Sequence, residues 1–169
     1  MLGWNRYVKD KRGTIYKYTK NHTLDRGRIV YVELFGHMGH ELTYPHLAVV
    51  LAEEHDWILI APTSTKAYND DNPYHIDLCK NNPEHGVDED CALMLDHIRA
   101  ISKQRVINKY RRLTCSQKLD EIDAAILKLY IPKLHEQMIK YETDIGRLKG
   151  IIEEKEKEIS RLKEIAQKN

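Results

Sequence analysis

The sequence predicts a mainly β fold with added helices: a small, strongly bent antiparallel β-barrel, a C-terminal helix and a long coiled-coil helix. Two observations lead to this fold class. Between residues 28 and 113, short runs rich in β-branched and aromatic residues are separated by turn-forming residues, as in an all-β domain. From residue 115 onward, apolar residues recur three and four positions apart, which is the period of a helix.

The β-rich runs define the expected strands. They span residues 28–35, 47–53, 57–61, 74–78, a further strand over 91–95 and 98–101, and a final short strand over 107–113. A polar, glycine-bearing loop over 36–46 separates the first two, and residues 103–106 fit a turn or short helix. Residues 14–18 also fit a short strand.

The helical part divides at Pro132, because proline interrupts or kinks a helix. A helix over 115–130 is expected first, and Thr114 with Gln117 has the form of a capping box at its start. Beyond the proline, steps of four and three residues alternate in a heptad seam. Its members are Leu134, Met138, Tyr141, Ile145, Leu148, Ile152, Lys155, Ile159, Leu162 and Ala166. Isoleucine at a and leucine at d favour a parallel two-stranded assembly.

Length and composition bound the function. A chain of 169 residues fits one domain with an appendage, here a basic arm at 1–27, a domain at 28–130 and a coiled coil at 131–169. Residues 1–28 hold eight Lys or Arg against two Asp, with four aromatic residues among them. Such an arm fits either an RNA-binding segment or a solvated surface hairpin.

Cysteine usage and hydropathy indicate a cytoplasmic protein. The three cysteines form no C-x-x-C pair, so neither a zinc site nor a disulfide framework is expected. No apolar run approaches the length of a membrane helix, and no leader-like segment begins the chain. The pair His37 and His40 is a poor metal signal without a third ligand, and no cofactor is expected.

Three segments carry the chemistry. The first is the loop 39–46, which brings a carboxylate and an imidazole to the start of an apolar strand. In the second, the apolar run 57–61 ends in Pro62 and three successive hydroxyl residues. The third is the stretch 91–103, with Arg99 and Lys103. Residues on loops and at strand ends are where binding and catalytic groups concentrate.

In this order and spacing, the three segments resemble the MazF/PemK family of toxin endoribonucleases, over roughly residues 26 to 130. The matching family features are a G-x-E loop, an R-P-x-V-V strand opening, a V-x-P-x-T-type strand end and an L-x-x-Q-I-R-x-[IL]-x-K-x-R block. The resemblance implies a half-open barrel of the plasmid-maintenance-toxin, Src-homology-3-like type. It also implies metal-independent cleavage of single-stranded RNA by its own 2′-OH, a homodimer and an antitoxin partner.

The resemblance also implies site residues. The family's loop arginine aligns with His46, its strand-end threonine with Ser64, and its loop glutamate with Glu41, so these three are the expected catalytic residues. Histidine can act as acid or base near neutral pH, where arginine only stabilises charge. The expected RNA-binding residues are Thr63, Thr65, Tyr44, His40 and Arg99.

Two other functions remain open on the same fold. One is a non-catalytic module that binds nucleic acid or a protein and is dimerised by the coiled coil. The other is a toxin of the related topoisomerase-poisoning type, directed at DNA rather than RNA, because fold alone does not settle function.

Overall fold

The computed structural model describes residues 22–34 and 42–168, with side chains described to residue 163. Contacts divide the chain after Ile126 into two units, which are described separately below. The strand expected at 14–18 lies outside the described residues, as do most of the basic arm and the histidine pair at 37 and 40.

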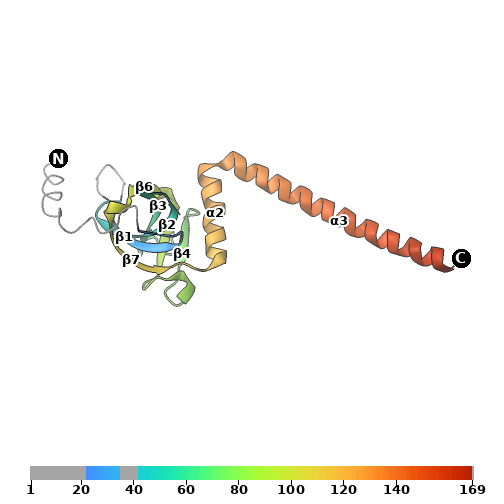
Figure 1. Cartoon of the computed structure of the whole chain (residues 1–169), viewed down its shortest axis with the longest axis horizontal. Helices are drawn as coiled ribbons and strands as arrows, with labels where there is room; N and C mark the ends of the chain where they lie inside the picture. The colour runs from blue at the N-terminus through green and yellow to red at the C-terminus, as the bar shows by residue number, and fades with distance from the viewer. Residues whose placement is uncertain (1–21, 35–41, 169) are drawn as a thin grey trace. The chain divides into compact units, whose positions relative to one another are not determined.

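The first unit contains a strongly curved antiparallel sheet (Figure 1). Its strands are β1 (Arg28–Glu33), β2 (Pro45–Glu53), β3 (Trp57–Ser64), β4 (His75–Leu78), β5 (Cys91–Met94), β6 (Arg99–Ser102) and β7 (Val106–Arg112). Their order is β4-β5-β3-β2-β1-β7, with β6 also pairing with β3. Because β4 and β7 end this path and do not pair, the barrel is half-open, which confirms the predicted fold class.

Helices occupy the connections and the C-terminal part. Within residues 22–34 and 42–168, three short 3-10 helices are η1 (Pro83–His85), η2 (Leu95–His97) and η3 (Lys103–Arg105). The α-helices of the same described part are α2 (Ser116–Tyr130) and α3 (Pro132–Lys168), so the break expected at Pro132 is present. In the described part of the chain, no helix has the apolar length that a bilayer crossing requires.

Both faces of the central strands are buried, because alternate residues enter two separate apolar clusters. Ile29 and Val49 belong to a cluster that Ile122 of α2 completes, and all three side chains are almost fully buried. Their strand neighbours Val30 and Val50 belong to the second cluster. The predicted helix therefore packs beside the barrel through one apolar face, as its spacing indicated.

The strand expected over 91–95 and 98–101 is interrupted by η2, and both of its parts pair with β3. Ile60 pairs with Arg99, and Thr63 pairs with Leu93. A step of three residues along β3 therefore corresponds to a step of six residues along the opposite chain. The extra residues form η2, which acts as a large bulge. A bulge on one side of a strand pair bends the sheet, and this bend helps to close the barrel.

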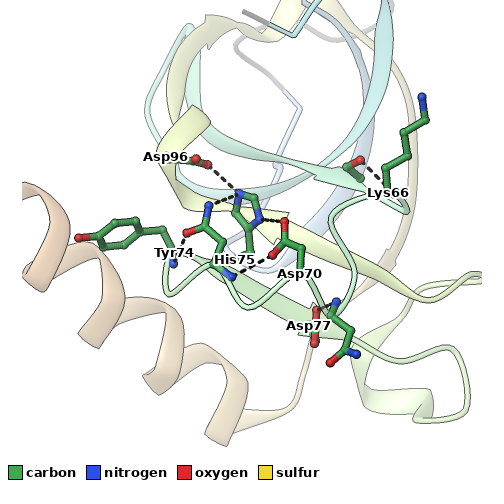
Figure 2. A network of polar contacts seen from close by, with 9 residues as sticks. Lys66, Asp70, Tyr74, His75, Asp77 and Asp96 are labelled. Atoms are coloured by element: carbon green, nitrogen blue, oxygen red, sulfur yellow. Dashed lines mark hydrogen bonds and ion pairs between the residues drawn. The ribbon is translucent and has the colours of Figure 1, made fainter. Parts of the chain in front are cut away.

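The segment between β3 and β4 is fixed by a polar network centred on His75 (Figure 2). The His75 Nδ1 atom lies 2.7 Å from Asp70 Oδ2, and Nε2 lies 3.2 Å from Asp96 Oδ1 on η2. The His75 side chain is largely buried between these carboxylates. Burial opposes ionisation of Asp70, but hydrogen bonds from the Asn72 backbone and from His75 outweigh it and lower the pKa of Asp70. The network therefore joins this connection to the bulge.

Candidate functional site

A cavity of about 1050 Å³ opens where the ends of several strands meet. Its walls come from β1, β2, β3, β5 and β7 and from the segment between η1 and β5. Four of the residues expected at the site line it: His46, Thr63, Ser64 and Thr65.

His46 lies inside strand β2, where it pairs with Val32 of β1. The sequence analysis put it on the preceding loop, and this was wrong, because the backbone becomes extended already at Pro45. Proline is tolerated at the first residue of a strand, so it does not prevent the pairing. A strand position holds the imidazole more rigidly than a loop would.

The backbone of Tyr44 orients the His46 ring. The His46 Nδ1 atom lies 3.2 Å from the Tyr44 carbonyl oxygen, and a carbonyl only accepts. Nδ1 must therefore carry a proton, so the neutral ring has its lone pair on Nε2. Tyr44 has a φ of 69°, which is uncommon for a residue with a side chain. Tyr44 is highly exposed and is not among the residues that line the cavity.

The three hydroxyl residues at the end of β3 differ in what their oxygens do. The buried Thr63 hydroxyl donates to the Leu47 carbonyl oxygen at 3.2 Å, so its proton is engaged in holding β2 against β3. Ser64 Oγ accepts from the Lys66 backbone N–H at 3.3 Å, a contact drawn in Figure 2, which leaves the Ser64 O–H able to donate elsewhere. Thr65 follows the strand and is exposed.

Strand register relates His46 to Ser64. Ala48 of β2 pairs with Pro62 of β3 in an antiparallel ladder, and the register shift in this ladder lies on the other side, beyond Val50. The ladder ends at this pair, and His46 and Ser64 lie two residues beyond it on their strands. Both residues line the same cavity.

Several residues that line the cavity were missed by the sequence analysis. They include Tyr31 of β1, and Tyr110 and Arg111 of β7. Tyr31 pairs with Asn108 in the sheet, so residues far apart in the sequence meet here. An isolated sequence offers no signal for this meeting, because each tyrosine alone fits an ordinary strand pattern.

The segment after η1 adds acidic residues to the cavity. Asp88 and Glu89 both line it, and Asp88 Oδ1 lies 3.1 Å from Arg111 Nη2. Gly86 fixes the path of this segment, since it has a φ of +69° and a Cβ there would lie 2.8 Å from the Arg112 carbonyl oxygen. The cavity therefore carries both signs of charge.

Cys91 also lines the cavity, but its chemistry excludes it as a nucleophile. Burial raises the pKa of the Cys91 thiol to about 11, although the Thr63 side chain favours the thiolate. A thiol with such a pKa stays protonated near neutral pH, and the thiolate is the reactive form.

The remaining expected site residues lie elsewhere or outside the described residues. Arg99 lies on β6 opposite Ile60 and is not among the residues that line the cavity. Burial and then the charge of Arg99 lower the pKa of Arg105, so these two cations lie near each other. Glu41 and His40 fall in the segment that the structure leaves undescribed. In the described ranges, no three His, Cys, Asp or Glu side chains are grouped to hold a metal ion.

The half-open barrel with a cavity at its strand ends defines a class of small β-barrel proteins, and comparison with known proteins gives the family. The family described as "PemK-like, MazF-like toxin of type II toxin-antitoxin system" matches residues 25–130. Because this match covers more than half of the chain, the protein belongs to that family. The resemblance that the three sequence segments indicated is confirmed.

One solved structure agrees at the level of the fold. The chain is similar to MazF (Form-I) from Deinococcus radiodurans, with 18% identity and a TM-score of 0.51, covering 64% of this chain and 97% of that one. It is also similar to a chain of MazE-MazF (Form-II) from the same organism, with 19% identity, a TM-score of 0.48, and coverage of 64% and 96%. No curated protein matches the sequence significantly.

Proposed function

We propose that this protein is a metal-independent endoribonuclease that cleaves single-stranded RNA through attack of the substrate's 2′-OH, as the toxin of a type II toxin-antitoxin system. Membership of the toxin family supports the toxin role. The observation that carries the chemistry is that His46 and Ser64 line one cavity. The Tyr44 carbonyl oxygen accepts from His46 Nδ1, which leaves the lone pair of the neutral ring on Nε2.

In the proposed reaction, Nε2 of His46 takes the proton of the 2′-OH as the 2′-oxygen attacks phosphorus. The new bond is 2′-O–P and the bond that breaks is P–5′-O, so the products are a 2′,3′-cyclic phosphate and a 5′-OH. The departing 5′-oxygen needs a proton, and His40 and Glu41 are the proposed donors. General acid and base groups of this kind each contribute about 10²- to 10⁴-fold to a rate.

Ser64 is proposed to stabilise the charge that develops on the phosphorus oxygens. Its Oγ accepts from the Lys66 N–H, which polarises the hydroxyl and leaves its proton available for an oxygen of the phosphorane. Thr65 is proposed to bind beside it, and Thr63 to hold the two strands in register. Donors already aimed at developing charge cost no reorganisation during the reaction.

The tyrosines and charged residues that line the cavity fit a single-stranded RNA. The rings of Tyr31 and Tyr110 offer faces on which unstacked bases can stack, and exposed Tyr44 offers a third. Arg111 and Lys66 supply positive charge for phosphates. Carboxylates repel phosphates but accept hydrogen bonds from base amino groups, so Asp88 and Glu89 are proposed to contact base edges. Arg99, on β6, is proposed to bind RNA beyond the cavity.

Further proposals follow from the same family membership. An antitoxin protein is the proposed inhibitory partner, and the toxin domain at 28–130 is proposed to form a homodimer. Messenger RNA as the substrate implies action in the cytoplasm. The basic arm at 1–27 is proposed as a separate segment that adds affinity for RNA.

The test is incubation of the purified full chain with total RNA in excess EDTA, beside the His46→Ala variant. Discrete cleavage that survives the chelator and is lost in the variant supports the proposal. Intact RNA with a shift in gel mobility would instead support a non-catalytic binding module. Cleavage that requires an added divalent metal would overturn the mechanism.

A further inference from the structure

Helix α3 carries an apolar seam that the single chain leaves open to solvent. The eight apolar members of the heptad seam in its described part are each between 41% and 64% exposed. They are Leu134, Met138, Tyr141, Ile145, Leu148, Ile152, Ile159 and Leu162. A long contiguous apolar surface of this kind marks an interaction site.

The helix is also poorly suited to stand alone. Gly146 and Gly150 weaken helices, and a Cβ at either position would meet nothing within 4 Å. No close approach therefore requires these glycines, and both fall at outward positions, b and f, of the heptad. Most helical stability in proteins comes from packing of the apolar face, so this helix needs a partner along its seam.

The charges flanking the seam identify the partner as a second copy of the same helix. With Ile145 and Ile152 at position a, Asp144 and Glu158 fall at g, and Lys149 and Lys163 fall at e. In a parallel pair, each g residue faces the e residue five positions later on the other helix. Asp144 then faces Lys149, and Glu158 faces Lys163, so every charged g residue meets an opposite charge.

An antiparallel pair fits less well. Residues at g then face each other, which brings Asp144 of one helix against Glu158 of the other when the seams are centred. Like charges in facing positions cost stability and specify against that arrangement. The charged seam member is Lys155, whose Nζ lies 2.6 Å from Glu158 Oε2 of the same helix in the single chain.

We propose that α3 of two copies of this protein forms a parallel, in-register two-stranded coiled coil, which tethers two toxin domains in one assembly. This proposal rests on the helix alone and is independent of the proposed RNA cleavage. Once one toxin domain of a tethered pair has bound a long RNA or a dimeric partner, binding by the second domain is intramolecular. Such a ligand would therefore bind the tethered pair more tightly than it binds a single domain.

The first test compares disulfide cross-linking of two cysteine variants made in the whole 169-residue chain. Leu148 is at position d, where the same residue of both helices meets in a parallel, in-register pair. Leu148→Cys should therefore form a symmetric disulfide under mild oxidation. Lys157→Cys, at the outward f position, is the matched control, and the unsubstituted chain reports any background from its native cysteines. Rapid cross-linking of Leu148→Cys alone is expected. Equal rates for the two variants would overturn the proposal, as would occupation of the seam by another protein.

Two substitution pairs then separate this interface from any interface of the barrels. Ile152→Asp should lower the mass measured by light scattering, whereas Ile139→Asp, at a similarly exposed isoleucine off the seam, should not.

Lys149→Glu should raise the dissociation constant of the dimer several-fold, and adding Asp144→Lys should restore it, because only the parallel register joins these residues. An unchanged mass for Ile152→Asp, or failure of the second change to rescue, would overturn the parallel pair. Circular dichroism checks that each barrel stays folded.

Discussion

The Nδ1 atom of His46 lies 3.2 Å from the carbonyl oxygen of Tyr44, two residues earlier in the chain. This contact fixes which ring nitrogen carries the proton in the neutral imidazole, since the carbonyl can only accept. The nitrogen left with a lone pair, Nε2, is the atom that our mechanism needs as a base. A backbone conformation at Tyr44 that is uncommon for a non-glycine residue thus has a direct chemical consequence.

Replacement of His46 should abolish RNA cleavage with little change in folding, because the side chain lies at the cavity surface and not in the core. His46→Arg should keep part of the activity that His46→Ala loses, since arginine cannot act as a base but stabilises developing negative charge. Cleavage of a labelled oligonucleotide measures both effects, and thermal unfolding serves as the control. Full activity in His46→Ala would exclude the imidazole from the reaction.

Ser64→Ala should slow cleavage by on the order of 10²- to 10³-fold, because a hydroxyl that donates to developing charge is lost. Ser64→Thr keeps the hydroxyl and is the matched control, with activity expected to remain well above that of the alanine variant. Single-turnover kinetics at saturating enzyme separate this step from RNA binding. Equal rates for the alanine and threonine variants would show that the hydroxyl takes no part.

A buried ion pair should contribute strongly to the stability of the barrel. Lys103 Nζ lies 2.6 Å from Glu53 Oε1, and the same ammonium donates to the His22 carbonyl oxygen at 3.2 Å. Lys103→Met should lower the free energy of unfolding by about 3 to 5 kcal/mol, because it leaves a mostly buried carboxylate without its cation. Urea denaturation of this variant, and of a double variant that adds Glu53→Gln, measures the effect. The double variant should recover part of the loss, and no recovery would count against the pairing.

The Asp70 carboxylate should make stability dependent on acid pH. Hydrogen bonds lower its pKa in the folded state, so its contribution is complete above the unfolded-state value, about 3.9, and is lost as pH falls through the folded-state value. Asp70→Asn should therefore be less stable than the parent at pH 7, and the difference should shrink below about pH 4. Unfolding curves from pH 7 to 2.5 test this, and a constant difference would contradict it.

The sequence was sufficient to predict the barrel, because apolar strand runs, turn residues and an amphipathic helix each have a local signature. The capping box expected at Thr114 and Gln117 stays a prediction, since the Thr114 hydroxyl donates to the Glu84 carbonyl oxygen at 3.4 Å. The sequence did not predict that η2 bulges the strand opposite β3, since that bulge depends on pairing with residues 30 to 39 positions away in the sequence. Part of the cavity was found from a motif around His46 and Ser64. The part with Tyr31 and Tyr110 arises from sheet order, which no local pattern encodes.

The most direct test of the account uses two RNA oligonucleotides that differ only by a 2′-O-methyl group at the cleaved nucleotide. The full chain in EDTA should cleave the unmodified RNA to a 2′,3′-cyclic phosphate and a 5′-OH, as identified by mass spectrometry, and should leave the methylated RNA intact. The His46→Ala variant, used in place of the parent chain, should leave both oligonucleotides intact. Cleavage of the methylated RNA at the same bond, or a product with a 5′-phosphate, would contradict attack by the 2′-OH and with it the role assigned to His46.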